Sequence, residues 1–383
     1  MQNHERTNIE TKSCCILPRK KIRFIRKNPQ CIQFFCHLHL IHECSGENDP
    51  LCSGEKTTKC QSRIYNKSSY ITDKNIDAPF AQDFIQRKLP LTLSDIRSEY
   101  EKYGSPVYIP RGQRFLLNPY IGQLKLFIML VQFLNLYYKS DGTTVIYPGF
   151  SPGLSLFLIN DMFPNIQWIL IDKSSHNKPD SNLIKLKNVK FFNQYLDKKN
   201  IHMFKKMCKG KYTLLVSDIR VETSEENIMA DNDLQLFWHR TLKPEYSCLK
   251  FRLPRNDQTK KYLYLRGEIF LQGFGPPSST ETRLHVRKNA NLVEYDYQKY
   301  DDMLYFFNNY QRSKYYGRAS SIIKKRSRFL LDHCYNCELF LDTLDKYFRI
   351  YRLRDDIKSV DLMVRKILTY LHVKTKLEEY FAI

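Results

Sequence analysis

The sequence has no run of apolar residues long enough to cross a membrane. Its longest apolar stretch, Leu124–Tyr138, is too short for a bilayer and contains Lys125, Gln132 and Asn135. A clean signal peptide is also missing, because the apolar run that follows Arg19–Lys27 starts late and contains two histidines. We therefore predict no transmembrane segment.

Acidic residues are few relative to basic ones. The 383 residues include 61 lysines and arginines against 40 aspartates and glutamates, which gives a formal net charge of +21. This excess favours polyanionic partners, although charge alone does not distinguish RNA, DNA and an anionic membrane surface. The 26 tyrosines and 24 phenylalanines supply faces that can stack on unpaired bases, which favours nucleic acid.

The cysteines show no pattern of pairing. Seven of the eleven lie within the first 60 residues, in an odd number and at irregular spacing. In a long chain without a signal peptide, this indicates mostly free thiols in a reducing compartment. His37, His39 and His42 lie close to these cysteines, but their spacing matches no standard zinc finger, so we predict no metal site.

Residues 1–95 lack clear hydrophobic periodicity. They are basic and rich in Cys, Ser, Asn, Lys and Thr, so we predict an N-terminal extension that is only partly ordered. Residues 96–318 carry the regular patterns and are expected to form one catalytic or binding domain. Residues 319–383 are expected to form a C-terminal helical segment.

Helical and strand-like segments alternate in the central part of the chain. An apolar stripe at helical spacing between residues 124 and 134 precedes the β-branched run Thr143–Tyr147. Further strands are expected at Gln167–Ile171, Val189–Phe192, Thr213–Val216 and Ser247–Phe251. The alternation predicts an α/β fold whose sheet is mostly parallel, with helices on both faces.

A glycine turn follows the first predicted strand, from Gly149 to Gly153. It has neither the Gly-x-Gly-x-x-Gly spacing of a dinucleotide site nor the Walker lysine of a P-loop. Asp172 ends the next strand, where a carboxylate can accept both ribose hydroxyls of an adenosine. Gly149, Asp172 and Asp218 all fall at strand ends, the edge where α/β sheets bind ligands. Such features occur in many α/β proteins and do not identify a cofactor alone.

Four charged residues form the second half of the candidate site: Lys125, Asp218, Lys250 and Glu281. Most charged residues are solvated surface groups, and that interpretation stays open. Against it, Lys250 lies inside the apolar run Cys248–Phe251, and Asp218 follows another apolar segment. Burial and neighbouring cations would favour the neutral form of one lysine, which can then take a proton from a sugar hydroxyl.

Six short motifs follow one another along the chain: Asn118–Leu126, Val145–Gly153, Trp168–Asp172, Leu215–Arg220, Ser247–Pro254 and Ser279–Leu284. In this order they resemble the catalytic domain of poxvirus cap-specific mRNA (nucleoside-2′-O-)-methyltransferases, which also serve as the small subunit of the viral poly(A) polymerase. The resemblance spans roughly residues 100 to 310. It implies a class I S-adenosylmethionine-dependent methyltransferase fold, which is Rossmann-like, and a large cytoplasmic DNA virus as the source.

The resemblance also implies the roles of single residues. Lys125, Asp218, Lys250 and Glu281 match the family's Lys-Asp-Lys-Glu tetrad, in which Lys250 corresponds to the general base and the others hold it and the ribose. The positions that match the family's pocket for S-adenosylmethionine are Gln123, Tyr147, Gly149, Gly153, Asp172, Asp218 and Arg220. The implied reaction methylates a ribose 2′-hydroxyl of capped mRNA and requires no metal.

The sequence departs from the family at two places. The family turn reads Gly-Ser-Ala-Pro-Gly, whereas Phe150 and Ser151 fill its middle here. In the family's cap pocket, aromatic rings sandwich a cationic methylguanine and carboxylates read its edge. Asp257 and Asp301 match the carboxylates, but Arg255 replaces one ring. A cation against a cationic base is unfavourable, so we expect cap binding to differ or to be lost.

Three functions follow from these patterns. The first is an enzyme, a 2′-O-methyltransferase that acts on capped mRNA. The second is a non-catalytic RNA-binding protein or a processivity subunit of a poly(A) polymerase. The third is a methyltransferase for an internal ribose of uncapped RNA. The expected partners are capped mRNA and a viral poly(A) polymerase or transcription machinery, without a membrane, in the host cytoplasm or the virion.

Overall fold

The computed structural model describes residues 89–103, 119–173, 178–219, 224–255, 261–275, 279–308 and 335–351, together with Arg312 and short stretches between 363 and 371. By its internal contacts the chain divides into two units. Residues 90–108 and 123–307 form one of them, which we call the sheet unit. The predicted division into 1–95, 96–318 and 319–383 stays a prediction, because most of the first segment lies outside the described residues.

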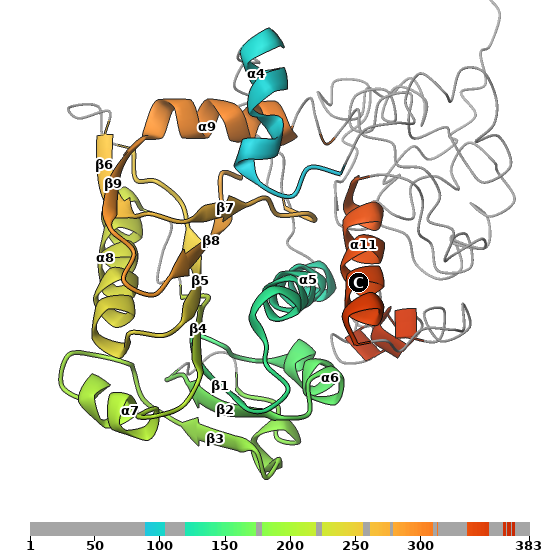
Figure 1. Cartoon of the computed structure of the whole chain (residues 1–383), viewed down its shortest axis with the longest axis vertical. Helices are drawn as coiled ribbons and strands as arrows, with labels where there is room; N and C mark the ends of the chain where they lie inside the picture. Colours follow the sequence, from blue (N-terminus) through green and yellow to red (C-terminus); the bar gives the residue numbers. More distant parts are fainter. Residues whose placement is uncertain are drawn as a thin grey trace, which may run out of the picture. The chain divides into compact units, whose positions relative to one another are not determined.

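A seven-stranded sheet forms the core of the sheet unit, with the order β3-β2-β1-β4-β5-β8-β7 (Figure 1). Its strands are β1 (Thr143–Pro148), β2 (Ile166–Ile171), β3 (Val189–Phe192), β4 (Thr213–Ser217), β5 (Tyr246–Phe251), β7 (Glu268–Phe270) and β8 (Thr282–Arg287). The first five are parallel, whereas β8 pairs antiparallel with both β5 and β7. This arrangement confirms the predicted mostly parallel α/β fold and adds two strands that the sequence patterns did not reveal, of which β8 alone runs opposite to the others.

Helices cover both faces of this sheet (Figure 1). They are α5 (Pro119–Tyr137) and α6 (Leu154–Met162) on one face and α7 (Ile201–Met207) and α8 (Glu225–Leu242) on the other. On the α5 face, the ring of Tyr137 stacks on Tyr246 of β5, with 3.9 Å between the centroids. On the α8 face, His239 hydrogen-bonds Ser247 of the same strand at 2.7 Å. Because both faces are covered, β1 and β4 are buried along their whole length.

Smaller elements complete the described chain. In the sheet unit they are a two-stranded antiparallel sheet of β6 (Lys261–Leu265) and β9 (Leu292–Asp296), the 3-10 helices η3 (Leu93–Ile96) and η4 (Leu183–Lys185), and the helices α4 (Arg97–Tyr103) and α9 (Tyr297–Phe306). The other unit contains α11 (Tyr335–Ile350), which falls within the segment 319–383 that is expected to be helical. Among the described helices, none has both the length and the apolar character that a membrane span needs.

The predicted glycine turn connects β1 to α6, and packing inside the protein explains both of its glycines. Gly149 has a φ of 75°, and a Cβ atom there would lie 2.8 Å from the Cγ2 atom of Ile219. Gly153 is the N-cap of α6 with a φ of 72°. A Cβ atom on it would lie 2.8 Å from the ring of Phe150, which is itself buried in the core. The turn therefore has little freedom to accept other residues.

A matched pair of substitutions separates two constraints on Gly149, its left-handed backbone and the lack of space for a Cβ atom. Gly210 has the same φ of 75°, but a Cβ atom there would have no neighbour within 4 Å. Gly210→Ala should cost about 1 kcal/mol of unfolding free energy, from the left-handed backbone alone. Gly149→Ala should cost that amount and a further ~1–3 kcal/mol, because the overlap with Ile219 must be relieved. Urea unfolding measures both, and equal losses would contradict this explanation.

Candidate active site

Strand alternation brings Lys250 and Arg283 to the same face of the sheet. On β5, Cys248 contacts Met129 of α5 through the two sulfur atoms at 3.4 Å, so Cys248 faces α5. Lys250 lies two residues further along the strand and faces the same way. Arg283 of β8 is its direct partner across the antiparallel pair. Both side chains therefore meet α5, which carries Lys125.

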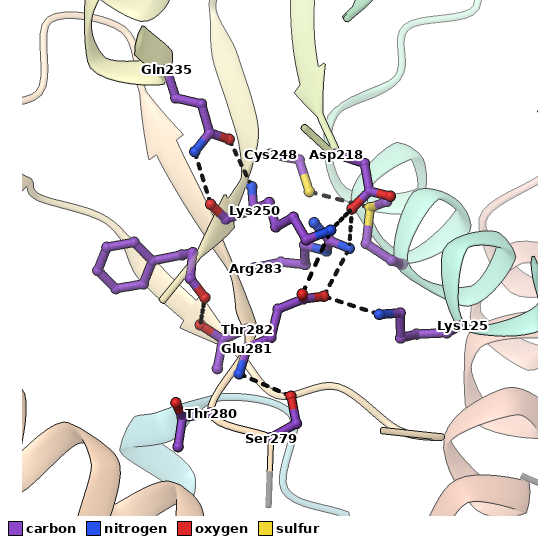
Figure 2. Close-up of polar contacts among 12 residues, drawn as sticks. Lys125, Asp218, Gln235, Cys248, Lys250, Ser279, Thr280, Glu281, Thr282 and Arg283 are labelled. Atoms are coloured by element: carbon purple, nitrogen blue, oxygen red, sulfur yellow. Dashed lines mark hydrogen bonds and ion pairs between the residues drawn. The ribbon is translucent and has the colours of Figure 1, made fainter. Parts of the chain in front are cut away.

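The four predicted tetrad residues converge in the sheet unit (Figure 2). Lys250 Nζ lies 3.1 Å from Asp218 Oδ1 and 3.6 Å from Glu281 Oε2. Lys125 Nζ donates to Glu281 Oε1 at 3.0 Å. Their side chains are 12% to 24% exposed, so these residues are not solvated surface charges. Since Asp218 follows β4 and Glu281 precedes β8, the cluster lies at the carboxyl edge of the parallel strands.

Arg283 is a fifth member of the cluster that the sequence analysis did not assign. Its side chain is 1% exposed, and its Nη2 atom lies 2.7 Å from Asp218 Oδ1 and 3.4 Å from Glu281 Oε1. The only signal in the sequence was its place two residues after Glu281, in the motif that carries that glutamate. We call these five residues the ion cluster: Lys125, Asp218, Lys250, Glu281 and Arg283.

The charges in the ion cluster determine the protonation of its carboxylates. Burial would raise the pKa of Asp218, but Lys250 and Arg283 outweigh burial and hold that pKa below its usual value. Burial would likewise raise the pKa of Glu281, yet Lys125 and Lys250 hold it well below its usual value. Both carboxylates are therefore ionised at neutral pH.

Gln235 of α8 holds the backbone of Lys250 from the opposite face of the sheet. Its Nε2 atom donates to the Lys250 carbonyl at 2.9 Å, and its Oε1 atom accepts from the Lys250 amide at 3.0 Å (Figure 2). The Gln235 side chain is fully buried. This pair of hydrogen bonds fixes the peptide units on either side of the Lys250 Cα atom, so the starting point of the lysine side chain is well defined.

Most of the predicted cofactor residues come from α5 and from the ends of β1 and β2. Asp172 follows β2, and its Oδ2 atom accepts a hydrogen bond from the backbone amide of Ser151 at 3.1 Å. Gln123 is buried, and its Oε1 atom has no hydrogen-bond partner within the described residues. Tyr147 is also buried, and burial raises the pKa of its phenol well above the usual value. Arg220 lies outside the described residues.

These residues fit the binding of an adenosine-containing cofactor. A buried amide oxygen without a partner, at Gln123, is satisfied when a donor such as an amino group binds there. Asp172 stands after β2, next to the β1 turn, where its carboxylate can accept hydroxyl donors. Gly149 and Gly153 contribute the shape of the turn, as their neighbours are protein atoms.

The predicted cap-binding residues form an ion pair of their own. Arg255 Nε donates to Asp301 Oδ2 of α9 at 2.8 Å, and the guanidinium also hydrogen-bonds the hydroxyl of Tyr305. The Arg255 amide donates to Glu225 Oε2 at 2.7 Å. The Oδ2 atom of Asp301 is thus bonded to Arg255, while its Oδ1 atom is buried and has no hydrogen-bond partner within the described residues. Asp257 lies outside the described residues.

A metal site finds no support within the described part of the chain. No group of three or more His, Cys, Asp and Glu side chains there is arranged to hold a metal ion. His37, His39, His42 and the cysteines near them lie outside the described residues. The cysteines of the described chain, Cys208, Cys248 and Cys337, are buried free thiols.

The depressed pKa of Glu281 predicts a pH-dependent stability. Its ordinary value is 4.5, and the folded value lies well below it. The stabilisation is therefore complete above about pH 5 and is lost as the pH falls through the folded pKa, with a slope of up to about 1.4 kcal/mol per pH unit. Glu281→Gln should be less stable than wild type at pH 7, and the difference should shrink between about pH 5 and pH 3.

Urea unfolding at a series of pH values measures this difference. Glu294→Gln is a suitable control, because Glu294 forms an ion pair on the surface with its side chain 59% exposed. Surface pairs contribute at most about 1 kcal/mol, so its difference from wild type should stay small at every pH. A difference for Glu281→Gln that does not change with pH would contradict the prediction.

Two viral proteins show the similarity of this chain to known proteins. A fowlpox virus "Cap-specific mRNA (nucleoside-2'-O-)-methyltransferase" is 30% identical over 254 residues, which cover 61% of this chain and 76% of that protein. The protein of the same name from myxoma virus strain Lausanne is 31% identical over 216 residues. That match covers 51% of this chain and 63% of the myxoma protein, slightly less than two thirds of its length.

A solved structure and a family model add to these relatives. The structure of bluetongue virus VP4, described as a multifunctional RNA-capping production line, matches with a TM-score of 0.40 and 16% identity. The match covers 51% of this chain and 35% of VP4. The Poly A polymerase regulatory subunit family matches residues 87–354, which is more than half of the sequence. The chain therefore belongs to the Poly A polymerase regulatory subunit family.

Proposed function

We propose that this protein transfers the methyl group of S-adenosylmethionine to a ribose 2′-hydroxyl of capped mRNA. The observation that carries the proposal is the position of Lys250, buried between two ionised carboxylates at the carboxyl edge of the sheet. That edge also holds the glycine turn and Asp172. The names of the fowlpox and myxoma relatives support the reaction and its substrate.

The ion cluster is suited to remove a proton from a hydroxyl group. When bound, S-adenosylmethionine supplies a methyl group that a positively charged sulfonium activates for transfer. With every group charged, the cluster contains three cations and two carboxylates. As the neutral amine, Lys250 can take the proton of the 2′-hydroxyl.

The carboxylates then stabilise the charge that develops during the reaction. Once Lys250 has taken the proton, its ammonium lies 3.1 Å from Asp218 and 3.6 Å from Glu281. These groups are already in place before the reaction, so little reorganisation is needed. Lys125 and Arg283 also pair with the carboxylates, and Gln235 fixes the Lys250 backbone. Positioning of the hydroxyl supplies a further share of the acceleration.

The residues that would hold the cofactor are the glycine turn, Asp172 and Gln123. Asp172 would accept the ribose hydroxyls of the adenosine, and Gln123 would accept a donor of the amino acid or the base. Asp218 belongs both to the predicted cofactor residues and to the ion cluster, because it follows β4 and contacts Lys250. Its carboxylate therefore links cofactor binding to the proton acceptor.

Lys250→Arg tests the role of the proposed base. Arginine keeps the positive charge but cannot become neutral at ordinary pH, so it cannot accept the proton. We expect methyl transfer to fall at least about 10²-fold, with cofactor affinity unchanged. Transfer of a labelled methyl group to RNA and equilibrium binding of S-adenosylmethionine measure the two quantities.

Lys288→Arg provides the matched control. Lys288 also forms an ion pair with a glutamate, but this pair lies at the surface and outside the ion cluster. Its variant should methylate RNA at the wild-type rate. Retained turnover in Lys250→Arg would rule out Lys250 as the base.

Strong RNA binding by a wild-type protein that never methylates RNA would instead favour the non-catalytic RNA-binding function.

One observation favours a second candidate, methylation of a ribose in uncapped RNA. The ion pair between Arg255 and Asp301 places a cation where the family has a stacking ring. The burial of Asp301, with its side chain 6% exposed, makes separation of this pair costly. Recognition of a cationic methylated guanine is therefore weakened, and the cap contributes less to substrate binding.

Methyl transfer to one short RNA distinguishes the candidates when its 5′ end is uncapped, carries an unmethylated cap or carries a cap with a methylated guanine. The proposed function predicts faster transfer to capped than to uncapped RNA. Because Arg255 repels a cationic base, we expect methylation of the cap guanine to improve transfer by less than about tenfold. Equal rates on capped and uncapped RNA would establish the second candidate. A preference above about 100-fold for the methylated cap would contradict the role we give to Arg255.

A further inference from the structure

An unusual excess of lysine lies between residues 173 and 211. This segment contains eleven lysines against two aspartates, with no arginine or glutamate. All eleven lysines are exposed. Within the described residues, no ion pair joins any of them to an acid, whereas Lys261, Lys288 and Lys299 elsewhere in the unit all have acidic partners. We call this surface the lysine edge.

The lysine edge surrounds one border of the main sheet. β3 forms this border of the sheet (Figure 1) and contains Lys190 in its sequence. Lys185 ends η4, which precedes β3, while Lys205 and Lys206 lie in the last turn of α7, which follows it. The connecting turns supply the remaining lysines, so the charge extends over the border and is not confined to one helix face.

Protection of a sheet border explains only part of this charge. A lysine on an outer strand prevents edge-to-edge pairing with another chain, and Lys190 is placed for that role. Lysines on α7 and in the flanking turns do not lie on the strand and protect no backbone hydrogen bonds. Eleven like charges with two acids among them also repel one another, which favours a polyanion as the missing counter-charge.

An exposed aromatic ring lies within the lysine edge. Tyr195 follows β3 and is 67% exposed, which is unusual for so large a ring. The Nζ atom of Lys173, which follows β2, lies 5.5 Å from the centre of this ring. Both residues come after the carboxyl ends of their strands, the edge that also bears Asp172 and Asp218. A flat ring beside cations is the arrangement that holds one unpaired base and its phosphates.

We propose that the lysine edge binds the backbone of single-stranded RNA, with Tyr195 stacking on one base. The choice of RNA rests on the proposed function, which makes RNA the substrate. Four strand spacings separate β3 from β5, so the edge begins about 20 Å from Lys250. An RNA must therefore extend several nucleotides beyond the methylated ribose before it reaches this surface. The lysine edge increases affinity for long RNA without taking part in methyl transfer.

A pair of triple variants with equal changes in net charge tests the proposal. The first is Lys199→Gln/Lys205→Gln/Lys206→Gln, within the lysine edge. The second is Lys261→Gln/Lys299→Gln/Lys346→Gln, whose lysines lie elsewhere and are 66%, 52% and 45% exposed. Fluorescence anisotropy with a labelled single-stranded RNA of about 30 nucleotides measures affinity at several salt concentrations.

The lysine-edge variant should bind this RNA at least about tenfold more weakly at low salt, and its salt slope should fall by about 2. The other triple variant should change affinity by less than about twofold. Tyr195→Ala should weaken binding about fivefold or more, with an unchanged salt slope, because it removes stacking and no charge. Wild-type affinity in the lysine-edge variant, or equal losses in both triple variants, would overturn the proposal.

Two further measurements complete the test. One asks whether the lysine edge binds RNA or a membrane, and the other asks whether the edge acts independently of methyl transfer. Binding to vesicles that contain phosphatidylserine tests a membrane as the partner. If the lysine-edge variant lost vesicle binding but bound RNA like wild type, the proposal would be overturned. Methyl transfer to a capped RNA of about four nucleotides should be equal in wild type and the lysine-edge variant, because this RNA cannot reach the edge. If wild type methylates no RNA but the edge still binds it, the proposed enzymatic function fails and the lysine edge stands.

Discussion

Mutual neutralisation of buried charges is the constraint on which this structure depends. Asp218, Glu281 and Arg283 lie in the interior of the sheet unit, and each would be strongly unfavourable there alone. Together with the two lysines they form a connected set in which every charge has a partner of opposite sign. The partners come from α5, β5, β8 and the segments after β4 and before β8. These elements must therefore come together before the charges become tolerable, and under the proposed function the same set then acts on a substrate hydroxyl.

Much of the fold could be predicted from the sequence, because β1 to β5 are apolar runs between helical segments. β1 and β4 are buried along their whole length and β2 and β5 along most of theirs, which produces the pattern, whereas β3 at the border of the sheet exposes Lys190. The strand β8 was missed because Thr282, Arg283 and His285 make it look polar, although all three are buried. The burial of Arg283 and His285 results from tertiary contacts with Asp218 and with aromatic rings of α5, and no local pattern reports such contacts. Arg283 was overlooked for the same reason.

The two halves of the candidate site differ in how far sequence reasoning reached. Lys250 was identified as a buried lysine from its apolar neighbours, and its exposed fraction of 12% confirms that burial. Gly149 and Gly153 match the family's cofactor positions, which stays a prediction, but the sequence alone could not show that their Cβ positions point at Ile219 and Phe150. The reason is that a positive φ and a close approach leave the same trace in a sequence, whether the neighbour is a ligand or the protein itself. Similarly, Arg255 could be recognised as a misfit, but its bond to Asp301 required the fold.

The antiparallel pairing of β5 with β8 makes the chemistry of the site sensitive to an assembly error. Lys250 and Arg283 face each other directly, and side chains alternate between the faces of a sheet. A slip of one position would turn Arg283 toward α8 and leave Lys250 facing α5 without it. Misassembled molecules would then bury the Arg283 guanidinium on the α8 face of the sheet, and the ion cluster would be incomplete. Under the proposed function, chains that reach the correct alignment are also the ones that can methylate RNA, so the same strand pairing determines both correct folding and activity.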